Sequence, residues 1–323
     1  MSGLAGIPAQ AGRIIRPLLP FRRRETVDYC AANGLWTHDD PANTDLRHSR
    51  ARVRHKVMPE LEQINPSAVK CLMRMAEIVR EEDQYLNSMS AALLEQSEER
   101  LNGDLHFLTK DCEVMLSLER LQSGPPVLVG RGLRLIAAYL GANLDFDQTT
   151  ALLAMVGGAR TGSVTCEGGA VVFEVDASHL HARELTPVEP YQYPLTMPGE
   201  TVSDEFGWQF LVHPVAVPSD PRRVSPLEAV LDQRKLRGNL FFRSQRPKDT
   251  IVPLGMDGSK PISQVLSDAK LTAAARSRLP IVYDMIGPIW VPGICIAERV
   301  RIDSTTELAI RLEFAPISGL NEP

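Results

Sequence analysis

The feature that most constrains the fold is a helical pattern of apolar residues that begins near Asn65 and continues to about Arg100. Asn65 is a favourable N-cap, and Pro66 takes the first helical position, where its missing N–H costs nothing. The apolar residues then recur at the 3.6-residue spacing of one helix face. They are Val69, Leu72, Met73, Ala76, Val79, Leu86 and Met89. Because this pattern exceeds the length of a typical globular helix, we expect the helix to span or link domains.

The residues ahead of this helix predict the end of a larger α/β sheet. Residues 12–19 form a short apolar stretch, predicted to be a buried strand, in which Pro17 forces Arg16 into an extended conformation. Residues 26–33 predict a short helix that ends at Gly34. Since one strand and one helix cannot bury their own apolar faces, we interpret residues 1–62 as the last part of an α/β domain.

Beyond the long helix, the apolar spacing first stays helical and then changes to two residues. Helices are predicted over residues 114–121, 127–140 and 147–156. After Gly157 and Gly158, the alternating runs 164–166 and 170–175 predict a β-hairpin. We therefore predict a mainly helical middle domain with a β-hairpin over residues 63–185.

The last part of the chain predicts a connector and a third domain. Residues 186–230 are rich in proline but keep alternating runs such as 208–213, so we predict a connector with some strand. Strands and short helices follow, which predicts a small α+β domain over residues 231–323. The predicted strands are 239–243, 251–252, 281–283, 289–292 and 307–314, and the predicted helices are 262–267 and 272–276.

Composition excludes several classes of protein. Hydrophobic residues make up 44% and charged residues 23% of the 323 residues, which is typical of a soluble globular protein. Without a long apolar run or a basic stretch ahead of the first apolar residues, we expect no membrane span and no secretory signal, hence a cytoplasmic protein. The five widely spaced cysteines form no CxxC or His/Cys cluster, so neither a zinc site nor a disulfide framework is expected.

Basic residues are concentrated near the start of this acidic chain, whose net charge is −5. Between Arg13 and Lys56, ten basic residues stand against five acidic ones, a local excess of five. The basic residues are Arg13, Arg16, Arg22, Arg23, Arg24, Arg47, Arg50, Arg52, Arg54 and Lys56. Such a stripe either binds a polyanion or is an ordinary solvated face, and charge alone does not decide between them.

Arg50 and Arg54 are the candidate site residues within this stripe. They lie four residues apart, so on a helix they share one face and form a fork suited to phosphate or carboxylate oxygens. Asp40 and Asn43 lie in the preceding polar segment, where Asx side chains commonly cap backbone groups. These two residues either only shape the turn and pair with the arginines or form the structural edge of a site. The sequence has no Walker, GxSxG or HExxH motif, and turns explain its paired glycines better than a phosphate-binding loop.

Taken in order, the motifs of both chain ends resemble the tRNA(Ile)-lysidine synthetases. The N-terminal segments are Gly3-Leu4-Ala5-Gly6-Ile7, Arg16-Pro17-Leu18-Leu19, Asp40-Pro41-Ala42-Asn43, Arg50-Ala51-Arg52-Val53-Arg54 and Met58-Pro59-Glu60-Leu61. The C-terminal segments are Arg243-Ser244-Gln245-Arg246-Pro247-Lys248-Asp249, Gly258-Ser259-Lys260 and Arg276-Ser277-Arg278-Leu279-Pro280-Ile281-Val282. For the fold, the resemblance implies the end of a PP-loop/Rossmann-like domain ahead of the helical middle domain and the α+β domain.

For function, the resemblance implies an ATP-dependent ligase that joins lysine to the wobble cytidine of a minor isoleucine tRNA with a CAU anticodon. The reaction passes through an adenylated intermediate and uses ATP and Mg²⁺. Arg50 and Arg54 would contact the ATP phosphates or the adenylated base, with Asp40 and Asn43 holding the turn. Residues that would contact tRNA phosphates, each of which is also explained as surface charge, are Lys235, Arg237, Arg243, Arg246, Lys248, Lys260, Lys270, Arg276 and Arg278.

The sequence departs from the family in two ways. Ala42 replaces Ser or Thr, Ala51 replaces Asn, and Lys248 replaces Gly. The 323 residues also contain no Ser-Gly-Gly-x-Asp-Ser loop, so we expect no binding of ATP and no lysidine synthesis by this chain alone. We interpret the chain as a truncated or mis-started synthetase. The alternatives are a non-catalytic tRNA-binding module and one half of a split enzyme whose PP-loop is on a separate, missing polypeptide.

Overall fold

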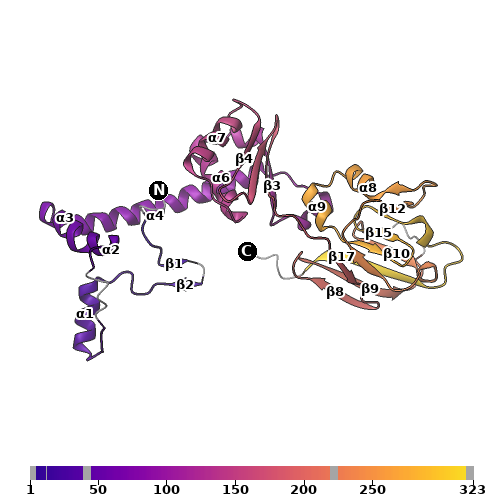
Figure 1. Ribbon diagram of the computed structural model, residues 1–323, viewed down its shortest axis with the longest axis horizontal. Coiled ribbons are helices and arrows are strands. Elements are labelled where there is room, and N and C mark those ends of the chain that lie inside the picture. Colours follow the sequence, from indigo (N-terminus) through magenta and orange to yellow (C-terminus); the bar gives the residue numbers. More distant parts are fainter. Residues whose placement is uncertain (1–4, 12, 39–44, 219–224, 318–323) are drawn as a thin grey trace. The chain divides into compact units, whose positions relative to one another are not determined.

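The computed structural model describes residues 5–11, 13–38, 45–218 and 225–317, and it divides into two compact units, residues 1–90 and 91–323 (Figure 1). Asp40, Ala42 and Asn43 lie outside the described residues, as does Gly12 of the first predicted strand. The predicted domain boundaries at residues 62, 185 and 230 stay predictions. Each of the two units is considered by itself.

The first unit begins with short, exposed elements. Strands β1 (Gln10–Ala11) and β2 (Ile14–Ile15) pair antiparallel. The prediction of a buried strand here is wrong, because 59% of Ile14 and 69% of Ile15 remain exposed and no described residue covers them. Helix α1 (Arg23–Ala32) follows and confirms the predicted short helix.

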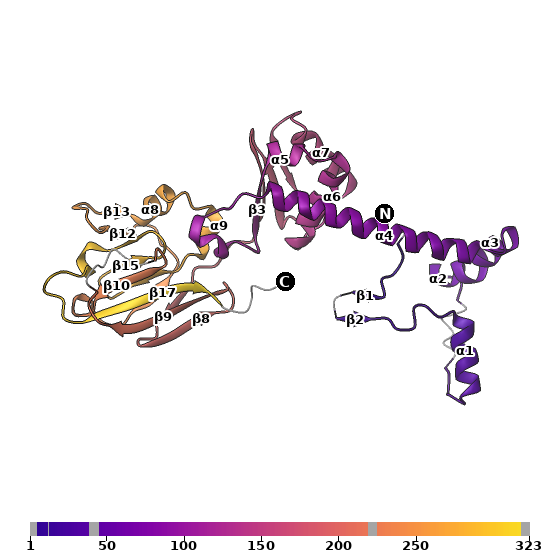
Figure 2. The same cartoon turned by 180° about the vertical axis from the view of Figure 1, so that it is seen from behind.

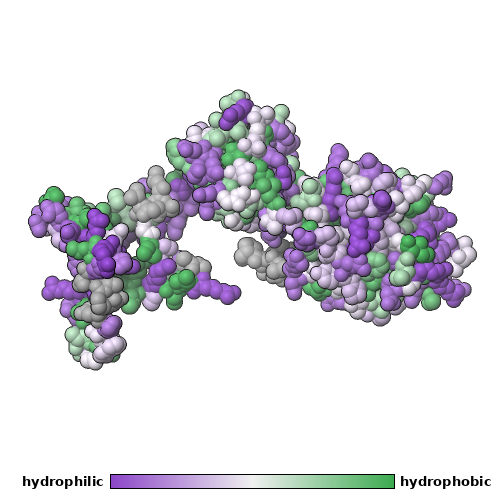
Figure 3. Space-filling model, viewed as in Figure 1, coloured by the Kyte–Doolittle hydropathy of each residue, from purple (hydrophilic) through white to green (hydrophobic). Residues whose placement is uncertain are grey.

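Three helical segments precede the long helix of the first unit. They are α2 (Ser49–Arg52), the π-helical turn η2 (Val53–Val57) and α3 (Met58–Ile64). Helix α4 (Ala68–Ser97) confirms the long predicted helix. Its early apolar residues Leu72, Met73 and Ile78 are exposed, and Figure 3 shows apolar residues, coloured green, at the surface of this unit.

The second unit opens with a four-stranded antiparallel sheet covered by helices (Figure 2). The sheet order is β3 (Glu113–Ser117), β6 (His179–Glu184), β5 (Val171–Val175) and β4 (Gly162–Thr165). The helical elements are the 3-10 segment η3 (Gly103–Leu108), α5 (Leu118–Gln122), α6 (Pro126–Tyr139) and α7 (Phe146–Val156). Helices α6 and α7 and the β4–β5 hairpin confirm three predictions.

Two further strands extend the predicted β-hairpin of residues 63–185 to a four-stranded sheet, while helical residues still outnumber strand residues in this segment. The expected helix 114–121 is instead strand β3 followed by the short α5, because residues 113–117 pair along their whole length with β6. Strand β6 was not predicted. Its buried Leu180 and Ala182 alternate with the polar His179, His181 and Arg183, so few apolar residues mark it. The region is therefore a sheet with helices.

The remainder of the second unit forms two main sheets. One has the order β10 (Glu228–Asp232), β17 (Ala309–Pro316), β9 (Trp208–Val215) and β8 (Gly199–Ser203). The other has the order β16 (Cys295–Ile296), β15 (Pro288–Val291), β14 (Ile281–Tyr283), β11 (Phe241–Arg243) and β7 (Gln192–Pro194). Strands β12 (Thr250–Ile251) and β13 (Lys260–Pro261) pair separately, and the helices are α8 (Ile262–Asp268) and α9 (Ala273–Arg278). The predicted α+β character is confirmed here.

The strand predicted within the connector 186–230 is confirmed as β9, but β7, β8 and the start of β10 also make this segment part of the two sheets. Strand β7 pairs with β11, and β9 pairs with both β8 and β17. The cause is the alternation of Trp208, Phe210 and Val212, whose side chains are buried in the shared core.

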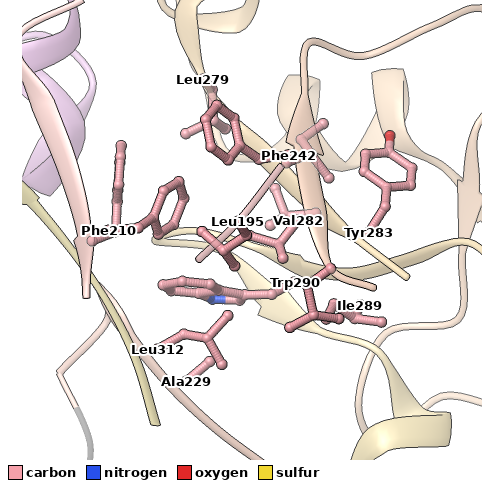
Figure 4. Close-up of a cluster of buried hydrophobic side chains, with 14 of the residues drawn as sticks. Leu195, Phe210, Ala229, Phe242, Leu279, Val282, Tyr283, Ile289, Trp290 and Leu312 are labelled. Carbon is pink, nitrogen blue, oxygen red and sulfur yellow. The ribbon is translucent and has the colours of Figure 1, made fainter. Parts of the chain in front are cut away.

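An aromatic cluster forms the centre of this core (Figure 4). The ring of Phe210 lies 5.5 Å from that of Phe242 and 5.9 Å from that of Trp290, centroid to centroid. Tyr283 stands at the rim of the group, and its hydroxyl points away from the other labelled side chains (Figure 4). Its ring is therefore packed in the core while its hydroxyl is available to a polar partner.

A buried carboxylate joins the two halves of the second unit. The Glu113 side chain is 1% exposed. Its Oε1 accepts hydrogen bonds from Asn102 Nδ2 at 3.0 Å and Thr272 Oγ1 at 2.6 Å, and its Oε2 lies 3.1 Å from His181 Nε2. Burial acts to raise the pKa of Glu113, but the hydrogen bonds from His181, Thr272, Thr109 and Asn102 hold it below its ordinary value. The carboxylate thus ties β3 to the N-terminus of α9.

Candidate functional site

The first candidate site is a hollow formed by α2, η2 and the start of α3. Arg50 and Arg54 both line it, together with Ser49, Val53 and Met58. Arg50 is exposed, Arg54 is half-buried, and neither forms an ion pair with a described residue. Both arginines therefore lie at one hollow, as their four-residue spacing predicted. A hollow bordered by two cations that no described residue pairs can hold an anion such as a phosphate.

The backbone of this hollow has an unusual local geometry. The π-helical turn at residues 53–57 adds one residue to the regular helical spacing, a feature that is frequent at functional sites. Ala51, at the place of the expected Asn, is buried. Just ahead of α2, Arg47 pairs with Asp45 at 2.7 Å, which neutralises one cation of the basic stripe. Hydrogen bonds from Arg47 lower the pKa of Asp45.

The second candidate site is the turn that follows strand β11. Arg243, the last residue of β11, is only 8% exposed. Its Nη1 and Nη2 donate to the two carboxylate oxygens of Asp249, each at 2.8 Å, and its guanidinium lies 4.0 Å from the ring centroid of Tyr283. Contrary to the prediction, Arg243 is not placed to contact a phosphate, because its donors face a carboxylate inside the protein.

Asp249 is the centre of the hydrogen bonds in this turn. Besides Arg243, it accepts from the backbone N–H of Arg246 at 2.7 Å and from the Tyr283 hydroxyl at 2.9 Å. Burial acts to raise the pKa of Asp249, but the bonds from Arg243, the Arg246 amide and Tyr283 hold the pKa below its ordinary value. Asp249 is therefore a charged anchor under the turn.

The turn presents two cations to solvent. Arg246 and Lys248 are exposed, on either side of Pro247. Arg246 Nη2 donates to Gln192 on β7 at 3.1 Å, whereas Lys248 forms no ion pair with a described residue. Lys248 also has a φ of 75°, in the left-handed region that favours glycine. We name residues 244–249 the basic turn.

The other predicted phosphate contacts are mostly engaged within the protein. Lys260 pairs with Asp268, and Lys235 Nζ donates to Asp303 at 2.7 Å. The Arg237 guanidinium donates to the carbonyl of Arg234 at 2.8 Å. These three side chains are therefore held by intramolecular partners.

The cations near α9 divide in the same way. Arg276 Nε donates to the carbonyl of Leu271 at 2.9 Å, and Arg278 is half-buried, with Nη2 3.9 Å from Glu184. Lys270 is exposed, has a φ of 56° and forms no ion pair with a described residue. Of the predicted residues, Arg246, Lys248 and Lys270 are thus the ones best exposed to a polyanion.

Two residues of the second site were not predicted. Tyr283 and Gln192 lie far from residues 243–249 in sequence and reach the basic turn through β14 and β7. Only the pairing of both strands with β11 brings them there.

Among the described residues, no group of three or more His, Cys, Asp or Glu side chains can hold a metal ion. No described helix is long and apolar enough to cross a membrane.

Comparisons with known proteins give matches at both ends of the chain. The PP-loop domain family matches residues 1–61, and the TilS substrate C-terminal domain family matches residues 240–313. The tRNA(Ile)-lysidine synthase of Symbiobacterium thermophilum is 29% identical over 96% of this chain and 67% of its own length. That of Dehalococcoides mccartyi is 29% identical over 94% of this chain and 64% of its own length.

Two further proteins match a smaller share of this chain. The tRNA(Ile)-lysidine synthase of Leifsonia xyli is 38% identical over 157 residues, which are 48% of this chain and 45% of that protein. A crystal structure of a TilS C-terminal domain covers 40% of this chain and 98% of its own, with 23% identity and a TM-score of 0.37. The chain spans about two thirds of the length of the curated relatives that match nearly all of it.

Proposed function

Because this chain belongs to the tRNA(Ile)-lysidine synthetase family, we propose that it forms the tRNA-binding part of a cytoplasmic ligase for lysine and a minor isoleucine tRNA. The reaction is the ATP-dependent ligation of lysine to the wobble cytidine of the CAU anticodon, through an adenylated intermediate. The observation that carries the tRNA-binding role is the basic turn. Inside the segment that matches the TilS substrate C-terminal domain, Arg246 and Lys248 are exposed over an anchored backbone.

The hollow in the first unit fits a phosphate group in this reaction. Arg50 and Arg54 form no ion pair with a described residue, and they lie in the segment that matches the PP-loop domain. We assign them to the phosphates of ATP or of the adenylated base, where fixed positive charge stabilises the charge that develops in phosphoryl transfer. Asp40 and Asn43 keep their proposed role of holding the turn ahead of α2.

Mg²⁺ is expected in the family, but the described residues of this chain do not fit it. The hollow is lined by two arginines, one serine and two apolar side chains and holds no carboxylate, whereas Mg²⁺ prefers carboxylate oxygens. No cluster of acidic side chains among the described residues offers such ligands. In our proposal the chain's own contribution is therefore positive charge that binds phosphate.

The Ser-Gly-Gly-x-Asp-Ser loop is absent from the 323 residues. We propose that these residues alone do not cleave ATP, and that any cleavage in which they take part uses a loop on other residues. The test is AMP release by the purified chain with ATP, lysine and the CAU-anticodon tRNA. We expect no more AMP than in a reaction without protein, and lysine- and tRNA-dependent turnover would contradict the proposal.

A second assay separates the split enzyme from a non-catalytic tRNA-binding module. The buried methyl group of Ala51, where an amide is expected, favours the module. The chain is mixed with a polypeptide that carries the PP-loop of a relative, and AMP release is measured again. Restored turnover supports the split enzyme. Unrestored turnover together with retained tRNA binding supports the module.

A further inference from the structure

The basic turn is held by a buried ion pair, although burying two charges to hold a surface loop costs desolvation free energy. Side chains of Arg243 and Asp249 are 10% and 14% exposed. Taking two charges out of water costs several kcal/mol per ion, which the pair recovers only with good geometry and further hydrogen bonds. This pair has both, since its contact is bidentate and Tyr283 and the Arg246 amide also donate to Asp249. Apolar residues of similar volume would stabilise the domain equally well.

The pair fixes the geometry of the turn in a way that apolar packing would not. The Asp249 carboxylate holds the Arg246 backbone N–H, and the Asp249 N–H donates back to the Arg246 carbonyl at 3.2 Å. The carbonyl of Asp249 accepts from the N–H of Ile262, which attaches the end of the turn to α8. Both ends of the segment Arg246-Pro247-Lys248 are therefore fixed, and the two cations leave a rigid backbone.

We propose that Asp249 is a positioning residue for RNA: it holds the basic turn so that Arg246 and Lys248 contact the phosphate backbone, while Arg243 and Tyr283 act through Asp249. The inference rests on the proposed tRNA binding. It adds a role in that binding for a residue that carries the same negative charge as the RNA phosphates. An aspartate beside a phosphate site repels the ligand through space. Its favourable contribution must therefore come from the geometry that it imposes.

The conformation of Lys248 supports a role for its side chain. A left-handed residue with a Cβ costs about 1–2 kcal/mol relative to the right-handed region, and glycine avoids this cost. Lysine is nevertheless present at a φ of 75°, with its side chain exposed and without an ion pair to a described residue. Strain of this kind is concentrated at functional positions. The strained backbone and the anchored carboxylate lie side by side in the chain.

The test measures the affinity of the full 323-residue chain for tRNA over a salt series, with Asp249→Asn as the main variant. The matched control is Asp257→Asn, an exposed aspartate of the same domain that also removes one negative charge. On charge alone, both variants bind RNA slightly more tightly. The proposal instead expects Asp249→Asn to bind more weakly and to lower the slope of log affinity against log salt by about 1.5–2, the loss of two phosphate contacts. Asp257→Asn keeps the slope of the original chain.

Two further variants separate positioning from general damage to the fold. Tyr283→Phe keeps the ring, the ion pair and all charges but removes one donor to Asp249. It is expected to melt close to the original chain and to lose part of the salt slope. Adding Lys248→Ala to Asp249→Asn is expected to change the slope little further, since that contact is already lost. If Asp249→Asn does not fold, Tyr283→Phe alone decides the outcome.

Opposite results overturn the proposal. A folded Asp249→Asn or Tyr283→Phe variant that binds tRNA with the original affinity and slope shows that the turn needs no anchor. If the original chain itself does not bind tRNA, the proposed function fails first. That result is distinguishable, because it appears before any variant is compared.

Discussion

Replacing Lys248 with glycine is expected to change stability and RNA affinity in opposite directions. At a φ of 75°, lysine carries the left-handed penalty of about 1–2 kcal/mol, which glycine does not. Glycine loses more backbone entropy on folding, about 0.5–1 kcal/mol. The difference between these terms predicts that Lys248→Gly raises the free energy of unfolding by about 0.7 kcal/mol, within a range of about 0–1.5 kcal/mol. The exposed side chain forms no ion pair with the described part of the chain that could offset this gain.

The same change removes one ammonium group from the basic turn. If that group contacts a phosphate, the slope of log affinity against log salt falls by about 1. Stability is measured by urea unfolding, followed by the fluorescence of the buried Trp208 and Trp290, and extrapolated linearly to water. Affinity is measured by filter binding of the tRNA between about 50 and 200 mM salt.

Two controls isolate the backbone from the charge. Lys248→Ala removes the charge but keeps the left-handed strain, so it is expected to weaken RNA binding without stabilising the chain. Lys270→Gly relieves the same strain elsewhere, at a φ of 56°, and is expected to stabilise by a similar amount. If Lys248→Gly destabilises the chain, or stabilises it while the salt slope stays unchanged, the account of this residue is refuted.

Three further predictions concern the second unit. Glu113→Ala leaves the donors of Asn102 and Thr272 without their acceptor and is expected to lower the free energy of unfolding in urea by about 2–3 kcal/mol. Phe242→Ala leaves a cavity in the aromatic core and is expected to lower the free energy of unfolding by about 3–5 kcal/mol in the same assay. The pKa values of Glu113 and Asp249 lie below their ordinary values of 4.5 and 3.8, so both carboxylates stabilise the fold above those values. Stability measured against pH is expected to stay level with respect to these two groups down to about 5 and to fall as they become protonated below their ordinary values.

Helices in which apolar residues recur at an uninterrupted 3.6-residue spacing were predictable from the sequence. Helix α4 and helix α7 follow long 3.6-residue patterns, and Asp145 caps α7 with its side chain on the N–H of Gln148. The sequence failed to predict those elements whose secondary structure depends on pairing with a distant strand. Residues 114–121 are compatible with a helix by spacing alone, but antiparallel pairing of β3 with β6 makes the first part a strand.

The proline content of residues 186–230 concealed strands β7 and β8, whereas the alternating run 208–213 predicted most of β9. Pro194 and Pro214 lie within β7 and β9, and the prolines predicted a connector. Strand β7 is at the edge of its sheet, where proline is tolerated. The burial of alternating residues in β9 was visible in the sequence. Its partner β17, about a hundred residues later, was not recognisable as such.

For both candidate sites, the sequence predicted which residues take part better than it predicted how their side chains are arranged. The four-residue spacing of Arg50 and Arg54 was sufficient to bring them to one hollow. For Arg243 the sequence does not distinguish a buried guanidinium from an exposed one. Asp249 lies only six residues away, but the pair becomes recognisable only when β14 brings Tyr283 over the same carboxylate.

We propose that this chain binds tRNA through exposed cations on an anchored surface. The most direct measurement is the affinity of the 323-residue chain for a CAU-anticodon isoleucine tRNA transcript over a salt series, without ATP. The account predicts saturable binding whose affinity falls steeply as salt rises, with a slope that decreases when Lys248 is replaced. Absence of binding at low salt, or binding that does not depend on salt or on Lys248, would contradict it.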